Sequence, residues 1–429
     1  MVNYILLCLI IIITSIFGGV NEYISGIQAY IDSGEYPKAN AEFQRAIKDF
    51  DANASLYFMG GEVAVKLDRL DDANKHYIKA IELDNKNEEY RSVQHNLEEL
   101  KNSMTSARKT FDSGRMDDAI IEFEKLTETF PQHAIGYYNL GRVYKVNEEY
   151  DSAVLNYKKA GELNPFEEKY SLAITAIAQE MAKEGDIEYR RQEFDSAIDN
   201  YKKAIQYSHA YTTAYFKLAR TYFKMKDYEN TRIILEENLA VDPKQDQSEK
   251  MLGDIYRSTG NPDDAIEHYN KAISINGNYY KAYYSLGTTL LSEGQNGEAR
   301  DALNTAILLE PTYAKAYGAL GTVEQELGEI DSAIDNYIRA VELDPKSYKF
   351  HYRLASALNM KNQYENAKKS AKECLNIKRN YAPAYFELGI SEKALGNKVA
   401  AADAFEKAKK DKNWRKSAQF ELDKLSKGF

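Results

Sequence analysis

Six basic and five aromatic side chains recur at spacings that would place them on one face of consecutive helices. The aromatic residues are Tyr138, Phe216, Tyr284, Tyr352 and Phe386, and the basic residues are Arg142, Lys145, Arg190, Arg220, Lys224 and Arg257. Arginine forms paired hydrogen bonds with carboxylates, and rings offer flat apolar contact. Together they would suit an acidic peptide segment. Two plainer interpretations stay open, because the rings could pack between neighbouring helices and the bases could form an ordinary solvated face.

Patterns typical of catalysis or metal binding are missing from the sequence. The six histidines are scattered and form no HExxH motif. Two cysteines, Cys8 and Cys374, are too few for a disulfide scaffold or a Cys-rich zinc site. No phosphate-binding glycine loop and no nucleophile elbow occurs. We therefore predict a protein that is not an enzyme and that holds no metal or cofactor.

The composition narrows the class of protein further. The 429 residues carry 56 basic and 66 acidic side chains, a formal net charge of −10, which argues against a nucleic-acid partner. An apolar content of 44% is too high for a disordered chain. Abundant Ala, Glu, Lys and Leu with only 8 prolines favour helices over strands.

A 34-residue spacing organises most of the chain. Gly253, Gly287 and Gly321 follow one another at this interval, as do Pro311 and Pro345. In this register eleven units begin at residues 20, 54, 100, 134, 178, 212, 246, 280, 314, 348 and 382. Counted from each start, position 8 is small, position 20 is nearly always alanine, and positions 4 and 24 are mostly aromatic. Each unit therefore predicts two antiparallel amphipathic helices that must stack on neighbouring units to bury their apolar stripes.

The repeated pattern resembles the tetratricopeptide repeat. In the unit that begins at residue 134 the matching residues are Tyr137, Leu140, Gly141, Tyr144, Ala153, Tyr157, Ala160 and Pro165. The resemblance implies an all-α fold, an α-solenoid wound into a right-handed superhelix of about eleven 34-residue helix-turn-helix repeats. It also implies that the first helices line a concave groove, and that this groove binds peptides or extended segments of other proteins.

Several units depart from the family pattern. Position 4 holds Ser103, Met181, Glu249 and His351 instead of an aromatic residue, and position 8 of the first unit holds Ile27. We expect looser packing at these places.

The aromatic series named above falls at position 5, and the basic series at positions 9, 12 and 13. These positions should line the concave face of the first helices. The charged clamp that the family uses for peptide tails is not supported, although Lys349 and Arg353 match its last pair of positions. The preceding clamp positions, which should be lysine and two asparagines, hold Tyr284, Thr288 and Ala319.

Two steps between units are longer than 34 residues. The steps from 54 to 100 and from 134 to 178 add 12 and 10 residues, and the apolar spacing predicts one long helix across each. We expect bends there, giving blocks at residues 20–87 (repeats 1 and 2), 88–167 (a long helix with repeats 3 and 4) and 168–415 (a long helix with repeats 5 to 11). Residues 416–429 should form a helix that caps the last repeat.

Residues 1–20 form a separate segment. Tyr4 to Val20 contain no charged side chain, and the run of 17 residues is at the short edge of what spans a bilayer. A cleaved secretory signal and an uncleaved anchor both stay open, and membrane contact is expected only through residues 4–20 in the second case. Both interpretations place the repeats outside the cytoplasm, in the periplasm or the extracellular space.

The sequence therefore predicts an exported, non-catalytic scaffold of a cell envelope that binds extended, acidic segments of other proteins in its groove. The alternative is an accessory factor that binds or assembles envelope polysaccharide, with groove tyrosines stacked on sugar rings. Self-association through aromatic-rich surfaces is a third hypothesis.

Overall fold

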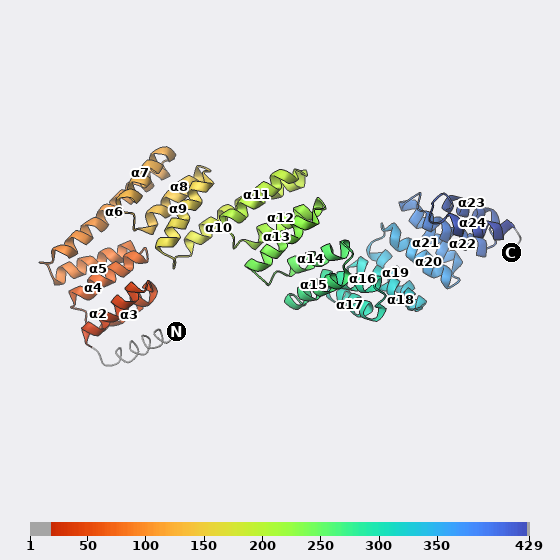
Figure 1. The fold of residues 1–429 in the computed structure, drawn as a ribbon, viewed down its shortest axis with the longest axis horizontal. Coiled ribbons are helices and arrows are strands. Elements are labelled where there is room, and N and C mark those ends of the chain that lie inside the picture. Colours follow the sequence, from red (N-terminus) through yellow and green to blue (C-terminus); the bar gives the residue numbers. More distant parts are fainter. Residues whose placement is uncertain (1–18, 427–429) are drawn as a thin grey trace. The chain divides into compact units, whose positions relative to one another are not determined.

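The computed structural model describes residues 19–426, which form 23 helices with no strand among them (Figure 1). The chain divides into two compact units, Met1–Leu218 and Ala219–Phe429, and each is described by itself. The predicted signal or anchor lies, except for its last two residues, outside the described part of the chain. Within residues 19–426 no helix is both long and apolar enough to cross a bilayer.

The first unit consists of helix pairs in chain order. The pairs are α2 (Val20–Asp32) with α3 (Tyr36–Asp49), α4 (Ala54–Lys66) with α5 (Leu70–Leu83), α6 (Glu88–Asp112) with α7 (Met116–Thr129), α8 (Ala134–Val146) with α9 (Tyr150–Leu163), and α10 (Lys169–Arg191) with α11 (Phe194–Tyr207). The next helix, α12 (Thr212–Lys224), spans the boundary between the two units.

The second unit continues the same alternation. Its helices are α13 (Tyr228–Val241), α14 (Asp246–Ser258) with α15 (Pro262–Ile275), α16 (Tyr280–Ser292) with α17 (Asn296–Leu309), α18 (Ala314–Glu326) with α19 (Ile330–Leu343), α20 (Tyr348–Met360) with α21 (Tyr364–Ile377), α22 (Ala382–Ala394) with α23 (Lys398–Ala408), and α24 (Arg415–Ser426). The all-α solenoid of stacked helix pairs that the sequence predicts is therefore confirmed.

The two longer steps in the register correspond to two long helices. The helices α6 and α10 have 25 and 23 residues, whereas the first helix of an ordinary repeat, such as α8, has 13. Their apolar residues at intervals of three and four continue through the added turns, so the extra residues extend a helix and form no loop. The bends and the three-block division stay predictions.

In six repeats, a glycine of the first helix lies directly against a ring of the second. A Cβ atom on Gly141 would lie 2.7 Å from Cδ1 of Tyr157, and one on Gly253 would lie 2.6 Å from Cε1 of Tyr269. No side chain fits in so short a distance, so glycine is what lets the ring approach the backbone. The same contact joins Gly61 to Tyr77, Gly185 to Tyr201, Gly321 to Tyr337 and Gly389 to Phe405.

At two positions that depart from the family pattern, a buried polar side chain forms a hydrogen bond in place of the usual ring contact. The buried Glu249 has its carboxylate 2.7 Å from Nδ1 of His268, and the ring of His268 stacks on Tyr256 with the centroids 5.1 Å apart. His351 is buried as well, and its Nε2 lies 2.9 Å from the carbonyl oxygen of Pro345. A buried, hydrogen-bonded polar group thus takes the place of the ring at Glu249 and at His351, and looser packing there stays a prediction.

In the first unit, repeats 1 and 2 contact the segment that follows repeat 4 (Figure 1). Asp68, in the turn between α4 and α5, accepts hydrogen bonds from the Tyr170 hydroxyl and, at 3.1 Å, from Nδ2 of Asn164. The rings of Tyr36 and Phe166 meet edge to face, with centroids 6.1 Å apart. The first four repeats thus curl back on themselves, which the sequence does not predict.

A cavity of about 470 Å³ lies between α4, α6 and the segment that joins α7 to α8. Apolar side chains such as Val93 and Leu97 line part of it, and Glu62, Lys66 and His133 line the rest. Burial, together with the positive charge of Lys66, lowers the pKa of His133 to about 4. Burial, together with the charge of Glu89, raises the pKa of Glu62. The imidazole in this cavity is therefore neutral at pH 7.

Replacing Gly141 with alanine should lower the free energy of unfolding by ~1–3 kcal/mol. The new Cβ would have to displace the Tyr157 ring or the carbonyl oxygen of Ala153, which is 3.1 Å away. Gly161→Ala in α9 is the matched control, since its Cβ would come no closer than 4.0 Å to Cβ of Tyr170. That variant should gain up to ~1 kcal/mol from helix propensity. Urea unfolding followed by circular dichroism measures both, and equal stability of wild type and Gly141→Ala would refute the packing argument.

The stability of the first unit should fall as the pH drops below about 6.5, the ordinary pKa of histidine. The folded His133 has a pKa of about 4, so the unfolded chain takes up a proton first. The free energy of unfolding should decrease between pH 6.5 and 4, by up to ~3 kcal/mol. His133→Gln should remove this part of the slope in urea titrations at pH 7, 6 and 5. His95→Gln, at an exposed site, should leave the slope unchanged; identical slopes in all three proteins would contradict the prediction.

Candidate functional site

The aromatic residues at position 5 are half-buried on first helices, and most of them contact a ring of the following repeat. The contacting pairs, with centroid distances, are Phe58 and Tyr90 at 4.5 Å, Tyr138 and Tyr170 at 5.3 Å, Tyr284 and Tyr313 at 5.2 Å, Tyr352 and Tyr381 at 5.5 Å, and Phe386 and Trp414 at 4.9 Å. Each partner lies at or next to the start of the following first helix or, for Trp414, of α24. Phe216 is also half-buried, on α12. These rings join consecutive repeats, so the series alone does not mark a ligand surface.

Position 9 of the first helix is within reach of the tyrosine at position 24. The hydroxyl of Tyr201 donates to Oδ1 of Asp186 at 2.8 Å, and that of Tyr269 donates to Oδ1 of Asp254 at 2.9 Å. In both repeats the acidic side chain therefore satisfies a group of the core. A ligand that bound there would have to compete with this internal hydrogen bond.

The basic residues of the predicted groove lie on first helices, and several have partners within the fold. Nζ of Lys145 is 3.0 Å from a carboxylate oxygen of Glu180, and Arg257 donates to Oγ1 of Thr288 at 3.1 Å. Burial raises the pKa of Tyr284, and the positive charge of the nearby Arg257 partly opposes this rise. Arg142, Arg190, Arg220 and Lys224 are exposed. Three of the six bases (Arg142, Lys145, Arg190) belong to the first unit and three (Arg220, Lys224, Arg257) to the second.

Two arginines of consecutive first helices lie close enough to repel each other. Arg108 on α6 has its pKa lowered by burial and by the charge of Arg142 on α8, while Asp112 acts in the opposite direction. The guanidinium of Arg142 lies 5.6 Å from the ring centroid of Phe111 and donates to Oδ1 of Asn139 at 3.3 Å. These contacts hold one guanidinium in place beside the other. A carboxylate between them would relieve the repulsion and accept hydrogen bonds from both.

Arg108 is the residue of this site that the sequence analysis missed. It occupies position 9 of the third repeat, the same position as Arg142 and Arg220. Comparing position 9 across every repeat would have identified it.

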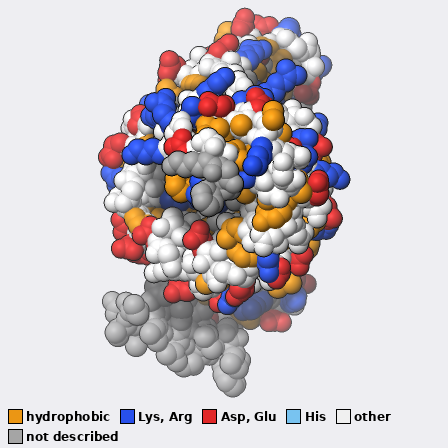
Figure 2. Space-filling view, turned by 90° about the vertical axis from the view of Figure 1, so that its right-hand side faces the viewer, with side chains coloured by type: hydrophobic (Ala, Val, Ile, Leu, Met, Phe, Trp, Pro, Cys, Tyr) orange, Lys and Arg blue, Asp and Glu red, His pale blue; other side chains and the backbone are white. Residues whose placement is uncertain are grey.

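Charge alone does not identify a ligand face. Figure 2 shows basic and acidic side chains interspersed over the face that it presents. Within residues 19–426 no group of three or more side chains of the metal-binding types gathers. Local arrangements such as the Arg108–Arg142 pair are therefore the features that can select a ligand.

Comparisons with known proteins agree with the helix pairs. A model described as TPR repeat matches residues 185–226, 253–292 and 321–361. Models described as tetratricopeptide repeat match residues 26–88 and, in a second case, residues 134–167, 212–245, 280–313 and 348–381. A comparison with curated proteins gave no match.

The similar solved structures include the following three. MamA protein is 29% identical over 39% of this chain and 92% of that chain, with a TM-score of 0.36. PilF of Pseudomonas aeruginosa is 18% identical over 51% and 97% of the two chains, with a TM-score of 0.46. The Cut9–Hcn1 hetero-tetramer of APC/C is 14% identical over 96% and 90%, with a TM-score of 0.49.

The matched segments agree with the observed helices in register. Residues 134–167, for example, contain α8 and α9, and residues 280–313 contain α16 and α17. Taken together, the family matches cover more than half of the sequence. Stacked repeats of this kind support a role as a protein–protein interaction scaffold. The chain belongs to the tetratricopeptide-repeat family.

Proposed function

We propose that the protein is an exported scaffold that binds an acidic, extended segment of another protein along its first helices and catalyses no reaction itself. The observation that carries this proposal is the Arg108–Arg142 pair. Both side chains reach solvent, although neighbouring atoms partly shield Arg108 from water, and both stand at position 9 of consecutive repeats. Their mutual repulsion makes the site favourable for an anionic group.

The spacing of the repeats suits an extended chain. Neighbouring packed helices lie about 8–10 Å apart. An extended segment advances about 3.3 Å per residue, so acidic side chains two to four residues apart would meet consecutive first helices. Arg142 would supply paired hydrogen bonds, and Phe111 beneath it would limit the loss of side-chain entropy on binding.

The polysaccharide alternative has less support. Sugar stacking needs exposed ring faces, whereas Tyr138, Tyr284 and Tyr352 contact rings of the following repeat. An acidic protein segment makes use of the charged residues without displacing those ring contacts.

The location outside the cytoplasm is proposed from the uncharged run Tyr4–Val20. After loss of that segment, Cys374 is the one remaining cysteine of the sequence, and it is buried in α21. The repeats therefore present no accessible thiol that an oxidising compartment could oxidise.

Reversing the charge of the arginine pair should abolish partner capture. The full chain is immobilised, incubated with an envelope extract and analysed by quantitative mass spectrometry. Proteins enriched by the wild type should fall at least tenfold with Arg108→Glu combined with Arg142→Glu, and should be released when salt is raised from 50 to 500 mM.

The control for this experiment is Lys125→Glu combined with Lys158→Glu. These exposed lysines lie on the second helices of the same two repeats, so the change in net charge is identical. Capture should persist with the control. Binding that survives both the arginine variant and high salt would refute an electrostatic peptide site and favour a glycan ligand.

Export can be tested with the N-terminal segment alone. Residues 1–33 fused to a reporter that needs disulfide bonds should give activity outside the cytoplasm. Ile11→Asp combined with Ile12→Asp should abolish that activity, because charges interrupt the apolar run. An inactive reporter that is found only in the cytoplasmic fraction would contradict export, and the mass of the mature full chain would distinguish a cleaved signal from an anchor.

A further inference from the structure

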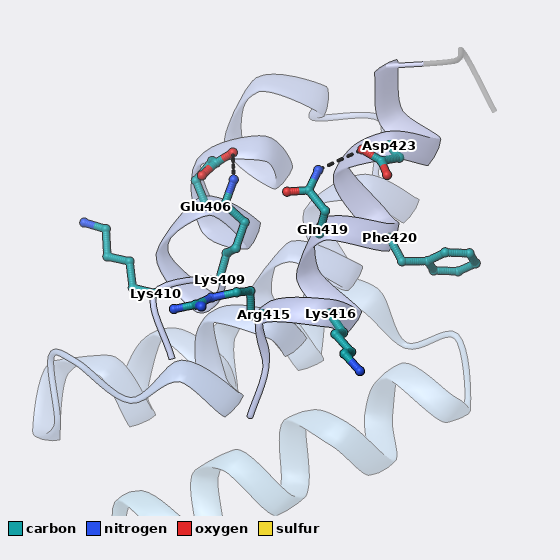
Figure 3. Close-up of a pocket in the computed structure, with 8 residues that line it drawn as sticks. All are labelled: Glu406, Lys409, Lys410, Arg415, Lys416, Gln419, Phe420 and Asp423. Carbon is teal, nitrogen blue, oxygen red and sulfur yellow. Dashed lines mark hydrogen bonds and ion pairs between the residues drawn. The ribbon is translucent and has the colours of Figure 1, made fainter. Parts of the chain in front are cut away.

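The C-terminal cap carries a cationic cleft that neither the repeat packing nor the proposed function uses. It lies between the end of α23 and α24 and has a volume of about 690 Å³ (Figure 3). The lining side chains are Glu406, Lys409, Lys410, Arg415, Lys416, Gln419, Phe420 and Asp423.

The two carboxylates of the cleft are already engaged. Glu406 accepts from Nζ of Lys409 at 2.8 Å, and Asp423 accepts from Nε2 of Gln419 at 2.8 Å. Among the described residues, no ion-pair partner within 4 Å is found for Lys410, Arg415 or Lys416. The cleft therefore presents three basic side chains whose charges are not neutralised locally.

This part of the sequence reverses the charge balance of the chain. Residues 407–427 contain eight basic and three acidic side chains, whereas the whole chain has a net charge of −10. A helix that served only to cover the last repeat would not need such an excess of positive charge.

The two faces of α24 have different partners. Ala418, Leu422 and Leu425 pack on the cluster around Phe405, which closes the last repeat. Phe420 is not part of that cluster, and 58% of its surface is exposed. Its ring lies 4.3 Å from Nζ of Lys424. The helix α24 thus carries a large exposed ring and an arginine, which are residue types enriched at protein interfaces, together with lysines that add positive charge.

We propose that this cleft binds an acidic segment of a partner protein that carries at least one large apolar side chain. Carboxylates of the segment pair with Lys410, Arg415 and Lys416, and the apolar side chain covers Phe420. A depression between two helical elements admits a chain segment more readily than it admits a flat lipid surface. The site is separate from the Arg108–Arg142 pair and does not rest on the proposed function.

The test uses synthetic twelve-residue peptides with the full chain. One peptide alternates glutamate with leucine, a second replaces leucine with serine, and a third replaces glutamate with lysine. Binding is measured by fluorescence anisotropy at 50 mM salt. The protein used throughout carries Arg108→Glu and Arg142→Glu, so that the other proposed site does not contribute. The glutamate–leucine peptide should bind, and the lysine peptide should not.

Charge reversal of the cleft should weaken this binding at least tenfold. The cleft variant carries Lys410→Glu, Arg415→Glu and Lys416→Glu in addition to the two arginine substitutions, and all three positions are exposed. The control adds Lys203→Glu in repeat 5 and Lys315→Glu and Lys346→Glu in repeat 9, all exposed, and it should change the affinity less than twofold. Phe420→Ser should weaken binding of the leucine peptide several-fold and leave the serine peptide unaffected.

Three outcomes would overturn the proposal. Equal loss in the cleft variant and the dispersed control would indicate a general effect of net charge. Binding of phosphatidylglycerol vesicles through the cleft, with no binding of the peptides, would indicate a lipid surface. A concentration-dependent dimer that the cleft variant abolishes, again without peptide binding, would indicate a second copy of the chain.

Discussion

In six of the eleven repeats, the contact between a glycine and an aromatic ring determines how closely the two helices pack and also affects the surface where a ligand would bind. Because no methyl group fits between Gly253 and Tyr269, the ring lies at a fixed depth and its hydroxyl reaches Asp254 at position 9. Where the second helix has no tyrosine at position 24, position 9 of the first helix does not need to accept a hydrogen bond from a hydroxyl. Phe123 and Leu235 stand at position 24 of repeats 3 and 6, and position 9 of those repeats is arginine. The core residue at position 24 thus influences which charge the first helix can present, although repeat 4 combines a tyrosine with an arginine.

A second contact determines how one repeat follows another. In repeats 2, 4, 8 and 10, the ring at position 5 meets a ring at or near the start of the next first helix, as Tyr352 does with Tyr381. The cap repeats this contact, because Phe386 meets Trp414 directly before α24. The cap helix therefore takes the place that the first helix of a further repeat would occupy. Phe420 of this helix is 58% exposed, and the helix has a charge pattern that differs from that of the repeats.

The sequence predicts the helix pairs well because their determinants recur every 34 residues. Small residues at position 8 and alanines at position 20 place both helices in register, and continuous apolar spacing reveals α6 and α10. The contact of Asp68 with Tyr170 involves residues 102 positions apart, and its existence depends on curvature that accumulates over three repeats. Periodicity carries no such information. It also places a side chain such as Tyr284 on a face without showing how near the neighbouring ring will be, so the ring series was ambiguous from sequence.

The long helix α6 combines the two kinds of surface that the first unit presents. Its first half, with Asn96 and Leu97, lines the cavity in which His133 stays neutral. Its second half carries Arg108 and Phe111, which face the charged side chain of Arg142. An ordinary first helix of 13 residues is too short for both tasks. The 12 added residues therefore let one helix line a cavity at its start and still present the arginine that lies beside Arg142 at the site proposed to bind an acidic segment.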